Sequence, residues 1–157
     1  MVMLSVVLAV YNEEEALGRC LESVKDLADE IVIVDGGSTD KTIEIGKKYH
    51  ARIIHTDNLP MFHINKQKAL DAAKGDWILQ LDADEVVSDA LRNEIQQVIH
   101  GTHPGVKSEN KKKLFERHQQ NIGRRDKNIG TGQGEIVAYF LPRLNFFLGG
   151  WLRHGGV

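Results

Sequence analysis

The sequence predicts a mostly parallel α/β fold, in which helices flank a central sheet. Short apolar runs alternate with helical patterns through the first 85 residues. These runs are continuous rather than alternating, which is typical of strands buried on both faces. The chain has 157 residues, 41% hydrophobic and 27% charged, as in an ordinary globular protein with a real core. Such strand and helix alternation favours parallel strands with right-handed crossovers, and we expect a single domain.

The first two strand and helix units are the clearest. Leu4 to Val10 is apolar and β-branched, which predicts a buried strand. Glu13-Glu14-Glu15 then opens a helix that runs to about Val24, with Asn12 as its expected cap and acids in its first turn. Residues 31–34 predict the second strand and residues 42–49 the second helix.

The next two strands are shorter. Residues 51–55 predict a third strand, and residues 64–74 a third helix that Gly75 ends. Trp77 to Leu81 then predicts a fourth buried strand, in which Trp77, Ile78, Leu79 and Leu81 are the apolar positions.

Beyond this strand the pattern weakens. Ser88 is the expected cap of an amphipathic helix to about His100. Its predicted inward positions are Leu91, Ile95, Val98 and Ile99. Residues 1–100 would form the main α/β part, residues 101–134 a basic mobile loop with one short helix near 110–120, and residues 135–157 a last segment of the same domain that opens with a strand at 135–141.

Polar residues follow the first, second and fourth strands, and parallel strands bring such residues to one edge of the sheet. The set gathered there would be Tyr11, Asn12, Glu13, Asp35, Gly36, Gly37, Asp82 and Asp84. Asp82, Asp84 and Glu85 would repel one another unless a cation neutralises them, and a hard divalent ion such as Mg²⁺ or Mn²⁺ is the simplest one. This composition indicates a nucleotide site with a metal. The alternative is an acidic turn that opens a helix.

The segment Asp35-Gly36-Gly37-Ser38-Thr39-Asp40 lies between a strand and a helix. Its glycines allow close backbone approach, and Asp35 can accept hydrogen bonds from a base or ribose. It is neither Gly-x-Gly-x-x-Gly nor a P-loop, which disfavours a dinucleotide site and a Walker-type site. The structural alternative is a turn capped by Ser38 or Asp40.

Charge divides the chain. Residues 1–100 carry 10 basic and 18 acidic side chains, whereas residues 101–157 carry 10 and 4. Two solvated faces of one domain would explain this, and so would a basic surface for phosphates or anionic lipid. The stretch Lys107 to Lys127 holds Phe115 as its only aromatic residue, which argues against nucleic acid and leaves a peripheral membrane contact as the better interpretation.

Cysteine and histidine usage adds two expectations. Cys20 is the only cysteine, so no disulfide framework exists and the cytoplasm fits best, with at most a peripheral position on the inner face of the membrane. The histidines, His55 among them, show no metal-ligand spacing and are expected at the surface.

Three ordered segments, Val6 to Glu13, Ile31 to Asp40 and Gly75 to Asp84, resemble the successive motifs of family 2 glycosyltransferases. The resemblance is strong over residues 2–100, and residues 142–156 are similar to a downstream segment of bacterial and archaeal members that build lipopolysaccharide core or related cell-envelope glycans. It implies a GT-A fold, a nucleoside diphosphate sugar donor, a divalent metal such as Mg²⁺ or Mn²⁺, and inversion at the anomeric carbon. We further expect a glycan or lipid-linked acceptor and a homodimer.

Carried over by position, the resemblance implies roles for residues of all three motifs. Asp35 would be the partner of the base, Asp82 would face the ribose or metal, and Asp84 would be the metal ligand that bridges the diphosphate. Lys66 stands where the family often has a basic residue near the nucleotide, although a solvated helix lysine is the alternative. The remaining implied nucleotide-sugar contacts are Ala9, Tyr11, Glu13, Gly36 and Ala83. Ala9 departs from the proline common in the family, which bears on the turn more than on the chemistry.

An inverting transfer needs a general base for the acceptor hydroxyl. After Glu94 the acids are Glu109, Glu116, Asp126 and Glu135, and Glu135 is the candidate because it starts a predicted strand. The chain is expected to stop before the acceptor half is complete, as a piece of a longer protein, a split or degenerate protein, or a minimal enzyme. A nucleotide-sugar-binding module that needs a partner chain is the rival function. A nucleotidyltransferase is disfavoured because the acidic segment after the first strand is the opposite of a basic phosphate loop.

Overall fold

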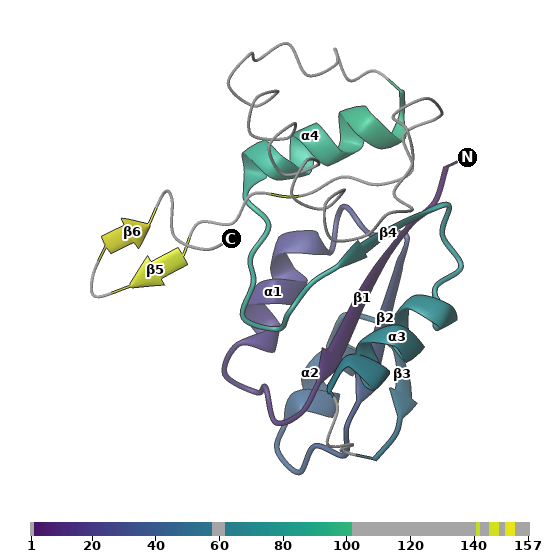
Figure 1. Ribbon diagram of the computed structural model, residues 1–157, viewed down its shortest axis with the longest axis vertical. Helices are drawn as coiled ribbons and strands as arrows, with labels where there is room; N and C mark the ends of the chain where they lie inside the picture. The colour runs from purple at the N-terminus through teal and green to yellow at the C-terminus, as the bar shows by residue number, and fades with distance from the viewer. Residues whose placement is uncertain (1, 58–61, 102–140, 142–144, 148–149, 153–157) are drawn as a thin grey trace, which may run out of the picture. The chain divides into compact units, whose positions relative to one another are not determined.

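The computed structural model describes residues 2–57, 62–101, 141, 145–147 and 150–152 (Figure 1). The chain divides into two compact units, Met1–Gly105 and Val106–Val157, and each is considered by itself. The predicted division at residues 100 and 134 stays a prediction. The predicted helix near 110–120 lies outside the described residues, and so does the predicted strand at 135–141 except for Leu141.

The first unit is built on a four-stranded parallel sheet in the order β3-β2-β1-β4. Its strands are β1 (Leu4–Val10), β2 (Glu30–Asp35), β3 (Arg52–His55) and β4 (Trp77–Gln80). In register, Val10 lies opposite Asp35, and Asp35 lies opposite His55. The predicted α/β class with a mostly parallel sheet is therefore confirmed. The carboxyl ends of all four strands lie along the same edge of the sheet.

Helices cover both faces of this sheet. They are α1 (Leu17–Val24), α2 (Thr42–Lys48), α3 (Phe62–Ala72) and α4 (Asp89–Ile99). Helices α1 and α2 contact each other, whereas α3 packs against β1 and β2 (Figure 1). Alternate residues of β1 divide between two cores. Val6, Leu8 and Val10 join the core that includes α1, and Val7 joins the core that includes Ala69 of α3.

Burial on both faces explains the continuous apolar run of β1. All seven of its residues are buried, including Ser5. A strand with one solvated face would alternate polar and apolar side chains, so the run of Leu4 to Val10 follows directly from the two helical layers. The same reasoning holds for β2, where the residues from Ile31 to Asp35 are buried.

Helix α1 begins later than predicted. Its N-cap is Ala16, no side chain caps it, and its first turn contains no acid. The predicted role of Asn12 as the cap is therefore wrong. The backbone N–H groups of Glu13 and Glu14 donate to Thr42 Oγ1 (2.7 Å) and Asp40 Oδ2 (3.0 Å), so another loop satisfies the donors that an earlier helix start would have presented.

The prediction that Ile78 is buried is also wrong, because its side chain is 43% exposed. Strand β4 lies at the edge of the described sheet, and Leu79, at 7% exposure, is its buried position. The Ser88 cap of α4 is confirmed, since Ser88 Oγ accepts from the N–H of Leu91 at 3.2 Å. Helix α4 buries no residue fully, but Leu91 and Ile95 pack against the larger core.

The described part of the second unit is an antiparallel pair of strands, β5 (Asn145–Phe147) and β6 (Gly150–Leu152). This pair was not predicted from the sequence. In the part of the chain that the structure describes, no helix is long and apolar enough to cross a membrane.

Candidate functional site

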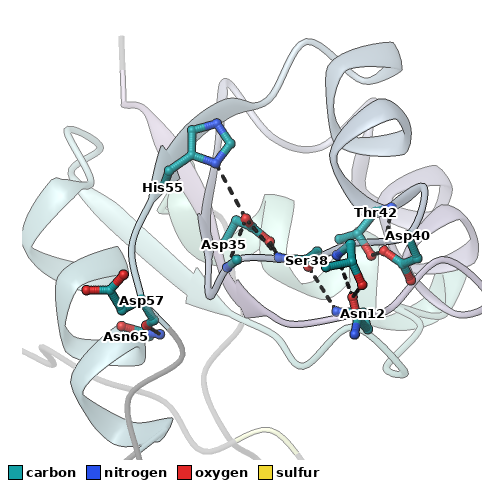
Figure 2. Close-up of polar contacts among 10 residues, drawn as sticks. Asn12, Asp35, Ser38, Asp40, Thr42, His55, Asp57 and Asn65 are labelled. Atoms are coloured by element: carbon teal, nitrogen blue, oxygen red, sulfur yellow. Dashed lines mark hydrogen bonds and ion pairs between the residues drawn. The ribbon is translucent and has the colours of Figure 1, made fainter.

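The loops that follow β1 and β2 are joined by reciprocal hydrogen bonds. Asn12 has a left-handed backbone, with φ of 53°. Its N–H donates to Ser38 Oγ (2.9 Å), and its side-chain Oδ1 accepts from the N–H of Thr39 (2.8 Å) (Figure 2). An asparagine tolerates this conformation better than most residues, and here its side chain bridges to the second loop. We call residues 11–16 and 35–42 together the paired loops.

A second set of bonds continues this connection. Thr42 is fully buried, and its Oγ1 accepts from the Glu13 N–H and donates to Asp40 Oδ1 at 2.5 Å. The Asp40 carboxylate also accepts from the N–H groups of Glu14 and Thr42. Burial raises the pKa of Asp40, but these hydrogen bonds outweigh it and the net shift is downward. Asp40 therefore stabilises the turn between β2 and α2, although the N-cap of α2 is Lys41.

Asp35 ends β2 as a buried carboxylate. It is 1% exposed, Oδ2 accepts from the N–H of Gly37 (3.1 Å), and both oxygens lie within 3.2 Å of the Ser38 nitrogen. Gly37 has φ of 87°, a conformation that favours glycine. A Cβ on Gly36 would lie 3.4 Å from the Val10 carbonyl oxygen and 3.6 Å from Asn65 Nδ2, so this turn is tightly packed beneath.

Two residues beside Asp35 were not found from the sequence as site residues. His55 ends β3, and its Nδ1 lies 3.4 Å from Asp35 Oδ2 (Figure 2). Asn65 of α3 is 4% exposed, and its Nδ2 donates to the Asp57 carbonyl oxygen at 3.4 Å. The end of a strand next to β2 was a usable signal for His55, whereas the burial of Asn65 depends on how α3 packs.

The loop after β4 supplies the acids. Asp82 pairs with Lys66 of α3, with Oδ1 and Nζ 2.5 Å apart. Lys66 therefore lies at the acidic loop after β4, and its contact with a nucleotide stays a prediction. Asp84 is exposed, Ala83 is 5% exposed, and Glu85 turns back so that its Oε2 accepts from the Asp82 N–H (2.9 Å).

Negative charge accumulates where these loops meet. Burial raises the pKa of Glu13, and the charges of Asp84, Asp40 and Asp82 raise it further. Burial, followed by the charges of Glu85, Asp84 and Asp82, likewise raises the pKa of the Cys20 thiol to about 12. Acids from loops that are distant in sequence therefore act on one another at a single edge of the sheet.

The acidic loop fits a partly hydrated divalent cation better than a closed protein cage. Among the described residues, no group of three or more His, Cys, Asp and Glu side chains is placed to hold a metal ion. Mg²⁺ and similar ions commonly use one or two carboxylates and complete their shell with water and substrate phosphates. Asp82 and Asp84 carry carboxylate oxygens of that kind, and after burial their charges and that of Asp40 raise the pKa of Glu13. Their role as metal ligands stays a prediction.

The remaining predicted site residues differ in exposure and in whether the structure describes them. Tyr11 is 41% exposed at the tip of β1, while Ala9 is 4% exposed inside the sheet, where it lies opposite Val34. Glu135 and the stretch from Lys107 to Lys127 lie outside the described residues. The predicted convergence of the first, second and fourth loops is thus observed, while the role of each side chain stays a prediction.

The four-stranded parallel sheet, with acids and a glycine turn at the carboxyl ends of its strands, has the GT-A fold of its structural neighbours. Residues 5–148 match the model of Glycosyl transferase family 2, and the chain belongs to this family. It is 46% identical over 85 residues to a TPR repeat-containing protein of Synechococcus elongatus. This match covers 54% of this chain and 21% of that protein. It is also 39% identical over 87 residues to an uncharacterized glycosyltransferase of Rickettsia bellii. This match covers 55% of this chain and 29% of that protein.

Solved structures agree with this fold. TarS residues 1–349 of S. aureus superpose with a TM-score of 0.57 at 26% identity, over 64% of this chain and 33% of that one. Glucosyl-3-phosphoglycerate synthase of Mycobacterium tuberculosis, solved with Mn²⁺, UDP and glucosyl-3-phosphoglycerate, gives a TM-score of 0.51 at 22% identity, over 67% of this chain and 41% of that one, which shows the fold alone. The matched part of this chain spans about a fifth to two fifths of the length of these relatives.

Proposed function

We propose that this chain binds a nucleoside diphosphate sugar and belongs to an enzyme that transfers the sugar, with inversion, to a glycan or lipid-linked acceptor. The observation that carries the proposal is the meeting of the paired loops with the Asp82–Lys66 pair at one edge of the sheet. Membership in a glycosyltransferase family supports the reaction class. The acceptor and the stereochemistry rest on the sequence resemblance.

At the nucleoside end, Asp35 would receive an N–H of the base, and the exposed ring of Tyr11 would lie beside the nucleoside. Gly36 would let the ligand approach the backbone, while Ala9 and Ala83, whose side chains are buried, would contribute through the main chain. UDP is the first nucleotide to test, because TarS residues 1–349 have also been solved with UDP, at 25% identity and a TM-score of 0.50.

At the diphosphate end, Asp84 and Asp82 would hold Mg²⁺ or Mn²⁺, with Glu13 contributing to the negative field around them. When bound, such an ion neutralises the diphosphate and makes it a better leaving group. Lys66 would exchange its contact with Asp82 for a phosphate oxygen, because an ammonium group binds phosphate as a point charge.

Four further parts of the proposal rest on the sequence. Glu135 would act as the general base on the acceptor hydroxyl. The stretch from Lys107 to Lys127 would make a peripheral contact with the inner face of the membrane, and the enzyme would work in the cytoplasm on cell-envelope glycans. A homodimer is the proposed assembly. The rival function, a binding module that needs a partner chain for turnover, keeps the same donor site.

Calorimetry with Mn²⁺ and a panel of UDP-, GDP- and ADP-sugars, paired with an assay for released nucleoside diphosphate, tests the proposal. We expect Asp84→Asn to weaken metal-dependent binding at least tenfold. Asp89→Asn is the matched control, because its carboxylate is 91% exposed in the first turn of α4. Binding without release favours the rival module. Equal affinity in the wild type and Asp84→Asn, or no binding of any nucleotide, contradicts both functions.

A further inference from the structure

The Asp35 carboxylate, which the proposed function assigns to the nucleobase, is closed off by its neighbours. Its side chain is 2% exposed, and its oxygens accept from the N–H groups of Gly37 and Ser38. These donors belong to the turn itself, so they cannot leave without remodelling the backbone around Gly37. Of the contacts that the structure describes for this carboxylate, only the one to His55 is made by a side chain outside the turn.

His55 is the neighbour that can move. Its Nδ1 lies 3.4 Å from Asp35 Oδ2, and its side chain is 67% exposed. Figure 2 shows the imidazole pointing at Asp35 from the adjacent strand, on the side away from Ser38. A ring that solvent surrounds on most sides can change rotamer without disturbing the core, which the two backbone donors cannot do.

We propose that His55 is a positioning residue that occupies the Asp35 carboxylate and yields it to the N–H of a nucleobase. This inference rests on the proposed function and deepens it, because it names the contact that a nucleotide must replace. A charge-assisted hydrogen bond to a carboxylate is about twice as strong as a neutral one, and histidine is the side chain whose charge commonly changes between about pH 5 and 8. If His55 holds the carboxylate that the base needs, its competition with the base is expected to depend on pH.

Other charged groups lie on the elements around His55. Asp35 faces the ring from β2, and Asp57 follows two residues later on the same segment. On α3, Lys68 donates to Thr56 Oγ1 at 2.5 Å, next to His55, and Lys66 pairs with Asp82. Variants that differ only at position 55 keep all these groups, so comparison at the same pH isolates the effect of replacing His55.

The test is calorimetric titration of UDP with Mn²⁺ between about pH 8 and 5.5, for the wild type, His55→Ala and His55→Gln. We expect His55→Ala to bind UDP more tightly than the wild type, by about twofold at pH 8 and about tenfold at pH 5.5. His55→Gln can donate to Asp35 but cannot gain charge, so its ratio to His55→Ala should stay constant. His63→Gln, at an exposed histidine of α3, should follow the wild type.

Pyrophosphate with Mn²⁺ is the ligand control, because it lacks a base and should bind all variants equally. A constant ratio of wild-type to His55→Ala affinity across this pH range would overturn the inference and leave the proposed function standing. Weaker binding of UDP by His55→Ala at every pH would also overturn it, since His55 would then support the ligand rather than compete with it. Failure of every variant to bind UDP would overturn both the inference and a uridine-based donor.

Discussion

At the N-terminal edge of the sheet, Glu30 is held by hydrogen bonds from Ser5 Oγ (2.7 Å), the Lys74 N–H (3.0 Å) and Arg52 (2.9 Å). At the opposite edge, burial and then the charges of Asp84, Asp40 and Asp82 raise the pKa of Glu13. The same sheet therefore has one edge where the ionised form of Glu30 is stabilised and one where the ionised form of Glu13 is disfavoured. Stored electrostatic repulsion at one end of a stable scaffold is what a site for a cationic or metal-bridged ligand requires.

Further hydrogen bonds join segments at the N-terminal edge. The Gly75 N–H donates to Ser5 Oγ (2.8 Å), and the backbone N–H groups of Leu4 and Met3 donate to Asp29 and Asp76 (2.8 Å each). The carboxylates named at this edge therefore receive donors from neighbouring segments. This difference predicts that substitutions at the N-terminal edge lower stability, whereas substitutions at the site edge lower binding.

The largest effect is expected for Gly75→Ala. A Cβ at this position would lie 2.6 Å from the Ser5 nitrogen and 2.8 Å from the Met3 carbonyl oxygen, so strand β1 would have to shift. We expect a loss of about 3 kcal/mol in the free energy of unfolding, measured by urea denaturation. Gly18→Ala in α1 is the control, because its Cβ would meet only Ile45 Cγ2 at 3.9 Å, and alanine there should be neutral or stabilising. Equal losses in both variants would contradict the packing argument.

A pair of polar substitutions compares the two edges directly. Ser5→Ala removes a fully buried hydroxyl that serves both Glu30 and Gly75, and should lower the free energy of unfolding by about 2 kcal/mol while leaving nucleotide affinity unchanged. Asp82→Asn should change stability by less than about 0.5 kcal/mol, because its lost pairing with Lys66 is offset by relieved repulsion, but should weaken nucleotide binding. Chemical denaturation and calorimetry on both variants check this reciprocal pattern, and a large stability loss in Asp82→Asn would break the comparison.

A smaller effect concerns pH and Glu30. Burial raises the pKa of Glu30, but hydrogen bonds from Ser5, Lys74 and Arg52 outweigh it and the net shift is below the usual 4.5. A carboxyl with a depressed pKa in the folded state stabilises the protein fully above its unfolded pKa and loses that contribution as the pH falls through the folded value. Glu30→Gln should therefore cost about 1.5 kcal/mol at pH 7, and the difference from the wild type should shrink below about pH 4. A difference independent of pH would contradict this.

Glu13 should show the opposite sign with the smallest magnitude. Burial and the neighbouring acids raise its pKa above 4.5, so its ionised form destabilises the fold above the folded-state pKa and this penalty disappears as the pH falls. Glu13→Gln should raise the free energy of unfolding at pH 7 by less than about 0.5 kcal/mol, because the group is partly solvated and its repulsion is screened. The gain should vanish near pH 4, and thermal unfolding at both pH values measures it. Destabilisation at pH 7 would show that Glu13 is needed by the paired loops.

The fold was predictable where strands are buried on both faces, because the sequence of such a strand is apolar at nearly every position. The apolar run of Leu4 to Val10 and that of Ile31 to Val34 gave the central strands, and parallel order then required the loops that follow them to meet. Ile78 was misjudged because an edge position cannot be recognised within a single strand. The β5 and β6 strands, of three residues each, are too short to show a periodic pattern.

The position of Asp35, Asp82 and Asp84 at one edge of the sheet was predictable, because parallel strands bring the residues that follow them to the same edge. Their roles stay predictions, and their contacts could not be predicted. The start of α1 was misplaced because it depends on bonds between segments 26 to 29 residues apart, from Glu14 to Asp40 and from Glu13 to Thr42. His55 was overlooked for the same reason, since its proximity to Asp35 exists only once β2 and β3 are paired.

The bonds between Asn12 and the 38–39 segment also bear on how this protein can change. Because each loop completes the other, the segments Tyr11 to Glu14 and Asp35 to Thr42 act as one structural unit, although residues 15–34 lie between them. If one segment alone were replaced by that of a distant relative, the hydrogen bonds between the two segments would lose one set of partners. If both were replaced together, donors and acceptors would be transferred together. A chimera designed to alter nucleotide choice should therefore transplant the two segments together.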